Sequence, residues 1–373
     1  MIKILFFIPT LAHGGAEKVL VNLVNNMDKT KFDITVQTLF AGGVNEKFLN
    51  RDIKYKYCYK KQFRGNSKYF CLFSPEHLYK KFIKEHYDII VSYLEGPTAR
   101  ITAGCTDKGT KLVSWIHVEQ HTKETASYSF KNYDEAKLCY GKFDKIICVS
   151  EYVKIDFGNI FDNVKNMEVL YNTIETDQII AKAEEPIDDY SFDKTVKTLV
   201  AVGTLKKSKG FDKLIRIHKR LLDDGFLHNI IVLGQGPEKD TLLKMISELN
   251  IKESFKLLGY NTNPYKYIKN SDMFVCSSVA EGFSTAATEA LVVGTPVVTV
   301  EVSGMKEMLG KNNEYGIITE NNEDALYEGI KKMLTTSGML EDYAKRAKER
   351  GKKFSKEKTV SAAEEMFFSL VKC

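Results

Sequence analysis

Short runs of apolar residues alternate along the chain with stretches in which apolar residues recur every three to four positions. The runs predict buried strands, and the stretches predict amphipathic helices. The predicted strands are residues 2–8, 32–40, 89–93, 111–116, 145–150, 198–202, 229–233, 255–258, 273–276 and 296–299. The clearest predicted helices are residues 16–26, 213–222, 238–249 and 356–371, together with a helix that ends at about residue 293. Strands separated by helices are typical of parallel sheets, so the pattern predicts an α/β protein.

The alternation stops once, at an acidic segment of residues 183–190 that contains Pro186 and has no apolar period. We take this segment as a linker between two doubly wound, Rossmann-like parallel sheets. The predicted domains are residues 1–186 and residues 187–354, and the helix within residues 355–373 is expected to pack back on the first domain. Ligands of doubly wound sheets bind outside the carboxyl ends of the strands, so a ligand is expected in the cleft between the domains.

Composition narrows the class of protein. The 373 residues include 54 Lys and Arg against 49 Asp and Glu, a formal net charge of +5, which does not describe a dedicated nucleic-acid binder. The seven cysteines contain no Cys-x-x-Cys pair, so reduced thiols are expected. The first apolar run is followed at once by glycines and charges, unlike a signal peptide, and no run approaches a spanning length. The expected location is the cytoplasm, with peripheral attachment to the inner face of the membrane as the alternative.

The most informative motif is Glu281-Gly-Phe-Ser-Thr-Ala-Ala-Thr-Glu289, which follows a predicted strand and opens a predicted helix. The loop before the helix holds Gly282, Ser284 and Thr285, and free N–H groups at a helix start favour an anion such as a diphosphate. The two glutamates lie about two helical turns apart, so they suit hydroxyl groups at two ends of a long ligand, such as a sugar and a ribose. Two glutamates at this spacing are common in a charged chain, and the strand–loop–helix context gives the motif its weight.

Three further turns follow predicted strands of the second domain. In residues 202–212, Gly203 can admit a ligand to the backbone and Lys209 can neutralise a phosphate, although a solvated lysine-rich turn explains the same pattern. Gly234, in a Gly-x-Gly turn, and Gly259 are weaker candidates, because such turns fit any doubly wound domain.

Two segments of the first domain are candidates for ligand contact. His13-Gly14-Gly15 joins a strand to a helix, where small residues leave room for a ligand or simply make a tight turn. His117 ends the strand that carries the single tryptophan, and is either a hydrogen-bonding group in the cleft or a structural histidine.

A metal site is not expected. His117, Glu119 and His121 alternate differently from His-Glu-x-x-His, and no third ligand is evident. The chain has no Asp-x-Asp pair, which argues against a divalent-metal diphosphate clamp. We therefore expect neither a metal nor another cofactor.

Residues 54–84 form a basic–aromatic stretch with a single acidic residue, Glu76. Its cations are Lys54, Lys56, Lys60, Lys61, Arg64, Lys68, Lys80, Lys81 and Lys84, and its aromatic residues are Tyr55, Tyr57, Tyr59, Phe63, Tyr69, Phe70, Phe73, Tyr79 and Phe82. An anionic membrane surface suits this composition, and so does a strand and a helix with core aromatics and solvated lysines. Nucleic acid is disfavoured as a partner. We take Lys60, Lys61, Lys80 and Lys81 as candidate contacts to a membrane or acceptor.

Taken in order, these segments resemble the retaining family 4 glycosyltransferases of the GT-B fold, also described as glycosyltransferases group 1. The resemblance covers nearly the whole chain. It is carried by Gly14-Gly15-Ala16-Glu17-Lys18, His117, Ser150-Glu-Tyr-Val-Lys154, Tyr171-Asn172, Lys209-Gly210-Phe211-Asp212 and the motif from Glu281 to Glu289. The resemblance implies that the second domain holds a nucleotide-sugar donor and that the first domain binds the acceptor.

The resemblance also implies roles for single residues. Glu281 would bind hydroxyls of the donor sugar, and Glu289 would bind the ribose. Lys209 and the N–H groups near Phe283, Ser284 and Thr285 would bind the diphosphate. Gly15 would lie near the diphosphate and His117 beside the sugar. One position departs from the family, which usually has arginine directly after the glycine at 203, where this chain has Thr204. Lys206 or Lys207 can compensate for that missing cation, or the donor is held differently.

The expected activity is therefore a metal-independent, retaining transfer of a hexosyl or N-acetylhexosaminyl unit. The donor would be a nucleotide sugar, most simply a UDP-sugar, and the acceptor a saccharide. The basic–aromatic stretch suggests a lipid-linked acceptor and a place in cell-surface polysaccharide assembly. Two alternatives stay open. One is a nucleotide-sugar epimerase on the same scaffold. The other is an inactive homologue that binds a membrane or a partner chain, which is considered because Thr204 replaces the family's usual arginine.

Overall fold

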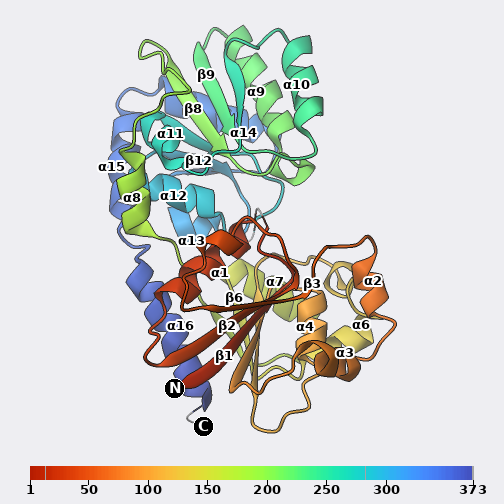
Figure 1. The fold of residues 1–373 in the computed structure, drawn as a ribbon. Coiled ribbons are helices and arrows are strands. Elements are labelled where there is room, and N and C mark those ends of the chain that lie inside the picture. The colour runs from red at the N-terminus through yellow and green to blue at the C-terminus, as the bar shows by residue number, and fades with distance from the viewer. Residues whose placement is uncertain (13, 282, 372–373) are drawn as a thin grey trace. The chain divides into compact units, whose positions relative to one another are not determined.

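The structure is a computed structural model that describes residues 1–12, 14–281 and 283–371 (Figure 1). His13 and Gly282, which belong to two of the predicted ligand turns, lie outside the described residues. The chain divides into two compact units: unit 1 contains residues 1–174 together with the segment that starts at Lys356, and unit 2 contains residues 175–355.

Unit 1 is built on seven parallel strands in the order β3-β2-β1-β4-β5-β6-β7. The strands are β1 (Ile2–Ile8), β2 (Phe32–Phe40), β3 (Lys54–Tyr59), β4 (Ile89–Tyr93), β5 (Lys111–Ile116), β6 (Lys145–Cys148) and β7 (Met167–Val169). The helices are α1 (Gly15–Asn26), α2 (Asn66–Phe70), α3 (Pro75–Phe82), α4 (Pro97–Thr102), α5 (Lys123–Ala126), α6 (Tyr133–Tyr140), α7 (Glu151–Ile160) and α16 (Lys356–Val371). The strand order reverses between β1 and β4, which is where doubly wound sheets bind ligands.

The last helix, α16, packs on the sheet of unit 1, far from it in sequence. The Phe367 ring meets the rings of Phe6 in β1 and Phe32 in β2 edge-on, with centroids 5.8 and 6.3 Å apart. The carboxylate of Glu364 accepts a 2.6 Å hydrogen bond from the N–H of Asp28. Burial of these rings is the main stabilising contribution that the helix makes to unit 1.

Unit 2 repeats the same topology with six parallel strands in the order β10-β9-β8-β11-β12-β13. The strands are β8 (Lys197–Val202), β9 (His228–Leu233), β10 (Phe255–Gly259), β11 (Met273–Cys276), β12 (Val297–Val300) and β13 (Ile317–Thr319). The helices are α8 (Thr176–Ala183), α9 (Phe211–Asp223), α10 (Lys239–Glu248), α11 (Tyr265–Asn270), α12 (Thr285–Val293), α13 (Met305–Leu309), α14 (Glu323–Thr335) and α15 (Met339–Gly351). The order reverses between β8 and β11.

The acidic segment of residues 183–190 is not a free linker, and the unit boundary lies before α8 rather than at residue 186. The segment is fastened to the α11 region of unit 2 by polar contacts. The Asn263 side-chain amide donates 2.8 Å bonds to the Lys182 carbonyl and the Glu185 carboxylate, and the Lys266 ammonium donates to the Pro186 carbonyl. The acidic residues of this segment therefore pair with a basic helix instead of forming a linker. The local sequence does not reveal that pairing.

The prediction of two doubly wound parallel sheets is confirmed. The expected bounds of β2, β4, β5, β11 and α16 coincide with the observed ones, and α12 ends where expected, although Thr285, expected in the loop before it, is its first residue. The strands β7 and β13 escape the pattern because three residues are too few to show a period. None of the described helices combines the length and the apolar character needed to cross a membrane.

Candidate functional site

Four loops meet along one edge of the unit 2 sheet, because β10, β9, β8 and β11 are neighbours and all parallel. Main-chain hydrogen bonds continue across them beyond the strands. The Gly203 N–H donates to the Leu233 carbonyl at 3.0 Å, and the Gly234 N–H donates to the Gly259 carbonyl at 2.8 Å. Three turns that are weak motifs separately are therefore one continuous edge at the reversal point of the sheet.

The loop after β8 closely approaches the loop after β11. Gly210 has a φ of +63°, and a Cβ on it would lie 2.2 Å from the carbonyl oxygen of Ser277. The Ser277 hydroxyl donates a 2.9 Å bond to the Lys209 carbonyl, and the Val279 N–H donates a 2.8 Å bond to the Ser208 carbonyl. Glycine at 210 is thus required by the contact that brings Lys209 to Glu281.

Lys209 and Glu281 form an ion pair at this edge. The Lys209 Nζ lies 2.5 Å from Glu281 Oε1, and the Ser278 hydroxyl donates to the same oxygen at 2.7 Å. The two side chains are largely buried, with 21% and 13% of their surface exposed. An ammonium can bind a phosphate and a carboxylate can accept sugar hydroxyls, so the pair offers both functions at one place.

The start of α12 lies next in the chain. The Ser284 hydroxyl caps the helix by accepting from the Ala287 N–H at 3.3 Å, and Thr285 is the first helical residue. Phe283 is buried against the Phe354 ring, with centroids 6.3 Å apart, and Glu289 is buried within the helix. A helix N-terminus beside an ammonium group suits a diphosphate.

Two glycines of this edge, Gly234 and Gly203, differ in why the fold needs them. A Cβ on Gly234 would lie 1.8 Å from the Gly203 carbonyl oxygen, so close packing of two loops requires that glycine. A Cβ on Gly203 would meet the Lys209 side chain and the Phe211 ring only at ordinary contact distances of 3.6 Å and beyond. Protein packing therefore requires glycine at position 234 but does not by itself require it at position 203.

Thr204 is exposed in this loop. Lys206 and Lys207 line a groove of about 640 Å³ that is bordered by α9, α10 and the start of α14, and neither Lys209 nor Glu281 belongs to its lining. Of these three lysines, only Lys209 pairs with Glu281 in the part of the chain that the structure describes. The geometry favours Lys209 over either neighbour as the cation for a phosphate.

In unit 1, the corresponding edge carries Gly15 and His117. Gly15 is exposed as the first residue of α1, whose N-cap Gly14 provides no side-chain cap. His117 follows β5 and is 6% exposed, and its imidazole lies on the Tyr93 ring with centroids 4.6 Å apart. Burial lowers the pKa of His117 to about 3, so the imidazole is neutral at neutral pH and acts by hydrogen bonding rather than as an acid.

The loop that starts at His117 does not gather metal ligands. The His121 imidazole lies 3.7 Å from the Asp156 carboxylate in α7, and across residues 1–12, 14–281 and 283–371 no three His, Cys, Asp or Glu side chains could hold a metal ion together. Sequence reasoning did not single out Asp156 or Glu95, whose carboxylates bind the main chain of this loop. The sequence signal that could have identified Glu95 was a charged residue just beyond the end of a buried strand.

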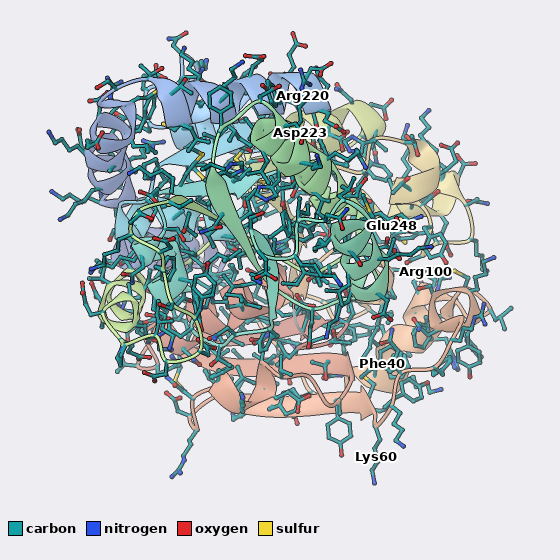
Figure 2. All side chains as sticks on the ribbon, turned by 90° about the horizontal axis from the view of Figure 1, so that it is seen from above. Phe40, Lys60, Arg100, Arg220, Asp223 and Glu248 are labelled. Carbon is teal, nitrogen blue, oxygen red and sulfur yellow. The ribbon has the colours of Figure 1, made fainter. Side chains whose placement is uncertain are left out.

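The basic–aromatic stretch separates into an aromatic core and an exposed basic rim. The rings of Phe40, Tyr59, Phe63, Phe70 and Phe82 contact one another. Lys60, Lys61, Lys80 and Lys81 are exposed, and Figure 2 shows the Lys60 side chain pointing outward. The Lys81 ammonium lies 5.5 to 6.0 Å from the centroids of the Tyr59, Phe73 and Phe82 rings, so it also covers the aromatic core. Leu72, at 75% exposure, lies in the turn between α2 and α3.

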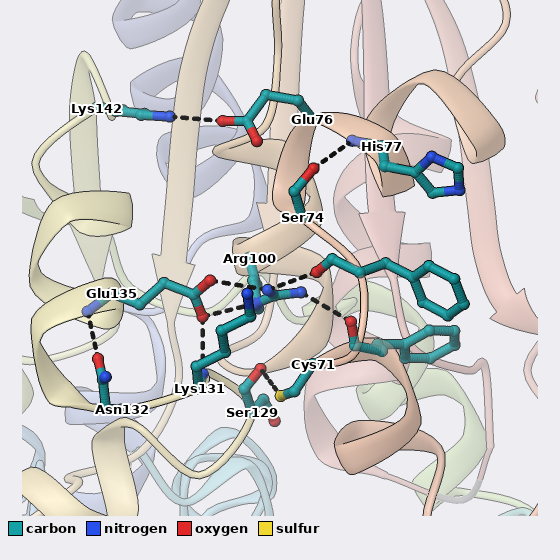
Figure 3. Close-up of polar contacts among 12 residues, drawn as sticks. Cys71, Ser74, Glu76, His77, Arg100, Ser129, Lys131, Asn132, Glu135 and Lys142 are labelled. Atoms are coloured by element: carbon teal, nitrogen blue, oxygen red, sulfur yellow. Dashed lines mark hydrogen bonds and ion pairs between the residues drawn. The ribbon is translucent and has the colours of Figure 1, made fainter.

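A buried arginine fixes that turn (Figure 3). Arg100 in α4 donates to the carbonyls of Phe70 at 2.9 Å and Phe73 at 2.8 Å, and makes a bidentate pair with Glu135 in α6. The Lys131 N–H donates to the same carboxylate at 2.7 Å. The exposed basic rim thus rests on a turn held from inside the unit.

The comparisons with known proteins cover both units. The model of the family described as Glycosyltransferase Family 4 matches residues 13–178, and that of Glycosyl transferases group 1 matches residues 183–353. A Campylobacter jejuni protein named N-acetylgalactosamine-N,N'-diacetylbacillosaminyl-diphospho-undecaprenol 4-alpha-N-acetylgalactosaminyltransferase is 32% identical over 375 residues. That match covers 96% of this chain and 97% of the relative.

Two solved structures share the fold at low sequence identity. Anabaena HepE in complex with UDP and glucose aligns with a TM-score of 0.77 at 16% identity, over 99% of this chain and all of the other. An Escherichia coli structure described as trehalose-6-phosphate bound with UDP-2-fluoro glucose aligns with a TM-score of 0.77 at 13% identity, over 100% of this chain and 99% of the other.

Proposed function

The chain belongs to the glycosyltransferases of family 4 and group 1, and on that premise we propose that it transfers a hexosyl or N-acetylhexosaminyl unit from a UDP-sugar to a lipid-linked saccharide. The family consists of retaining, metal-independent enzymes of the GT-B fold, and this chain is one of them. The observation that carries the donor proposal is the pair of Lys209 and Glu281 beside the start of α12, at the reversal point of the unit 2 sheet.

The proposed chemistry uses charge and position rather than a covalent nucleophile. Lys209 and the N–H groups at the start of α12 bind the diphosphate and stabilise its growing negative charge as it leaves. The bond between the sugar C1 and the diphosphate oxygen breaks, and the bond from C1 to the acceptor oxygen forms on the same face. The acceptor's proton passes to the departing diphosphate oxygen.

The remaining residues hold the donor in place for that step. The Glu281 carboxylate accepts hydroxyls of the donor sugar once the donor diphosphate draws the Lys209 ammonium away from it. The family resemblance assigns Glu289 to the ribose, Gly15 to the diphosphate and His117 to the sugar. Positioning of this kind supplies much of the rate enhancement in a reaction without a protein nucleophile.

Two observations favour a lipid-linked acceptor. The Campylobacter jejuni relative carries undecaprenol in its name as part of its substrate, and it is similar to this chain along nearly its full length. Lys60, Lys61, Lys80 and the apolar Leu72 of the same stretch are all exposed, a combination that suits an anionic lipid surface. The polymer assembled at such a surface would be a cell-surface polysaccharide.

Donor binding is tested first, without an acceptor. With a chelator present, we expect one UDP-sugar from a panel of UDP-, GDP-, ADP- and dTDP-sugars to raise the Tm. Glu289→Gln should abolish most of that rise, because an amide accepts ribose hydroxyls less strongly than a carboxylate. Glu328→Gln, which changes an exposed glutamate of α14, is the matched control and should keep the full shift.

The same panel separates the alternatives. If no nucleotide sugar changes the Tm, the donor site is absent and a binding protein becomes the better description. An epimerase would convert a bound UDP-sugar to its epimer with no acceptor present, which chromatography of the incubated donor would detect. A transferase leaves the donor unchanged until a lipid-linked saccharide is added.

Membrane attachment is tested separately. A variant with Lys60, Lys61 and Lys80 changed to Glu is expected to lose most of its binding to vesicles containing anionic lipid, since each basic residue near such a surface contributes about 1 kcal/mol. Lys81 is left unchanged because its ammonium covers the aromatic rings. The control changes Lys252, Lys345 and Lys348 of unit 2, which alters net charge equally. Equal binding by both variants and the wild type would remove the membrane proposal.

A further inference from the structure

The loop that carries His117 is held by two carboxylates that belong to other segments of unit 1. Glu95 Oε1 accepts hydrogen bonds from the N–H groups of His117 at 2.5 Å and Val118 at 2.8 Å. The carboxylate of Asp156 accepts from the N–H groups of Gln120 at 2.6 Å and His121 at 3.2 Å. Four of five successive N–H groups are therefore fixed by two side chains.

The two carboxylates reach the loop from opposite neighbours of β5. Glu95 lies two residues after β4, which pairs with β5 so that Tyr93 lies opposite Trp115. Asp156 belongs to α7, which follows β6 on the other side of β5. The main chain at residues 117–121 is thus bridged between two rigid elements, and its conformation is set by the sheet rather than by its own sequence.

Holding the loop in this way requires an unfavourable backbone conformation at two residues and the burial of a carboxyl group. Leu94, directly before Glu95, has a φ of +110°, and His121 has a φ of +61°, both outside the range that side-chain-bearing residues prefer. Burial raises the pKa of the Glu95 carboxyl, while the bonds from Val118 and His117 oppose that rise. Strained backbone and a desolvated carboxylate persist where the surrounding fold enforces a particular geometry.

What the loop presents is a buried polar atom with no partner in the protein. His117 Nε2 is buried and makes no hydrogen bond within residues 1–12, 14–281 and 283–371. The same holds, over those residues, for the Tyr93 hydroxyl and the Trp115 Nε1, and the Tyr93 ring contacts both the imidazole and the indole. Buried polar atoms normally have partners, so these three point to a polar ligand or water.

We propose that Glu95 is a positioning residue of the transferase: it fixes the main chain at His117 and Val118, and so orients His117 Nε2 for the sugar contact that the proposed function assigns to it. Glu95 itself touches no substrate. Asp156 supports the far end of the same loop. The inference rests on the proposed function for the identity of the ligand, but the clamp on the loop is a property of unit 1 alone.

The test compares three variants by calorimetric titration with UDP and with the UDP-sugar that gives the largest thermal shift. Glu95→Ala should weaken binding of the UDP-sugar about tenfold or more while leaving binding of UDP unchanged, because the proposed function assigns the sugar, and not the UDP, to His117. Glu95→Gln should restore most of that affinity, since an amide oxygen can accept the same two N–H groups. Simple destabilisation of the protein would not discriminate between UDP and the UDP-sugar.

Asp144→Ala is the matched control. Asp144 also accepts a main-chain N–H on β5, from Leu112 at 2.8 Å, but at the opposite end of that strand. We expect this variant to lower the Tm without altering the ratio of the two affinities. Equal losses of UDP and UDP-sugar binding in the Glu95→Ala and Asp144→Ala variants would overturn the positioning role.

Hydrogen exchange gives a readout that needs no ligand. Amides of residues 117–121 should exchange at least tenfold faster in Glu95→Ala than in the wild type or in Asp144→Ala. Unchanged exchange would overturn the clamp whatever the ligand experiments show. If the wild type bound no UDP-sugar, the proposed function would fail, and faster exchange in Glu95→Ala would still establish that Glu95 holds the loop.

Discussion

Lys209→Met is expected to lower kcat about 10²–10³-fold, which corresponds to about 2.7–4 kcal/mol of lost transition-state stabilisation. The ammonium is held 2.5 Å from Glu281 at the reversal point of the unit 2 sheet, beside the start of α12. Negative charge grows on the diphosphate as it leaves, so the loss should fall mainly on kcat rather than on donor affinity. The measurement is steady-state transfer from the UDP-sugar to a lipid-linked saccharide.

Lys206→Met is the matched control, since it removes the same charge three positions earlier. Lys206 lines the groove beside α9 and α10 and takes no part in the ion pair, so the activity of the variant should stay within about threefold of the wild type. A loss as large as that of Lys209→Met would show that Lys206 replaces the cation missing at Thr204. Equal activity of Lys209→Met and the wild type would contradict the proposed role of the pair.

Arg100→Met is expected to lower the stability of unit 1 by about 3–5 kcal/mol, the usual cost of leaving one member of a buried ion pair unpaired. Arg100 is completely buried, and its loss would strand the Glu135 carboxylate and the carbonyls of Phe70 and Phe73 together. The corresponding fall in Tm is roughly 6–20 °C for a unit of this size. Thermal unfolding followed by calorimetry checks it.

The control for this prediction is Lys142→Met. Lys142 pairs with Glu76 at 3.4 Å on the surface, where both side chains are nearly half exposed, and such pairs contribute about 0–1 kcal/mol. A double variant, Arg100→Met with Glu135→Leu, should recover part of the stability because it removes the unpaired buried charge. If Arg100→Met is no less stable than Lys142→Met, the turn between α2 and α3 is not held in the way the contacts indicate.

Local pattern was sufficient for the central elements. β2, β4 and β5 are fully or largely buried runs, and continuous apolar sequence is the signature of a strand covered on both faces. The end of α12 at residue 293 was predicted, but Thr285 was placed in the loop before the helix, whereas it is the first helical residue after the N-cap Ser284. Short elements such as β7 and β13 were missed because three residues carry no period.

The segment at 183–190 shows where local pattern fails. Its acidic composition and Pro186 are typical of a linker, yet Glu185 binds Asn263 and the Pro186 carbonyl binds Lys266, both far away in the sequence. A charged segment looks the same whether its partners are water or a basic helix. Only the packing of α11 decides between the two, so the boundary lies before α8.

The sequence by itself determined the doubly wound architecture, the family and the chemical types of the candidate site residues, because periodicity, caps and strand–loop–helix motifs are local properties. The tertiary structure decided which of them meet. Gly210 and Ser277 must touch before Lys209 reaches Glu281, and β4 must lie beside β5 before Glu95 can hold the loop of His117. Contacts between residues distant in the chain depend on how strands are ordered in a sheet, and no single segment of the sequence determines that order.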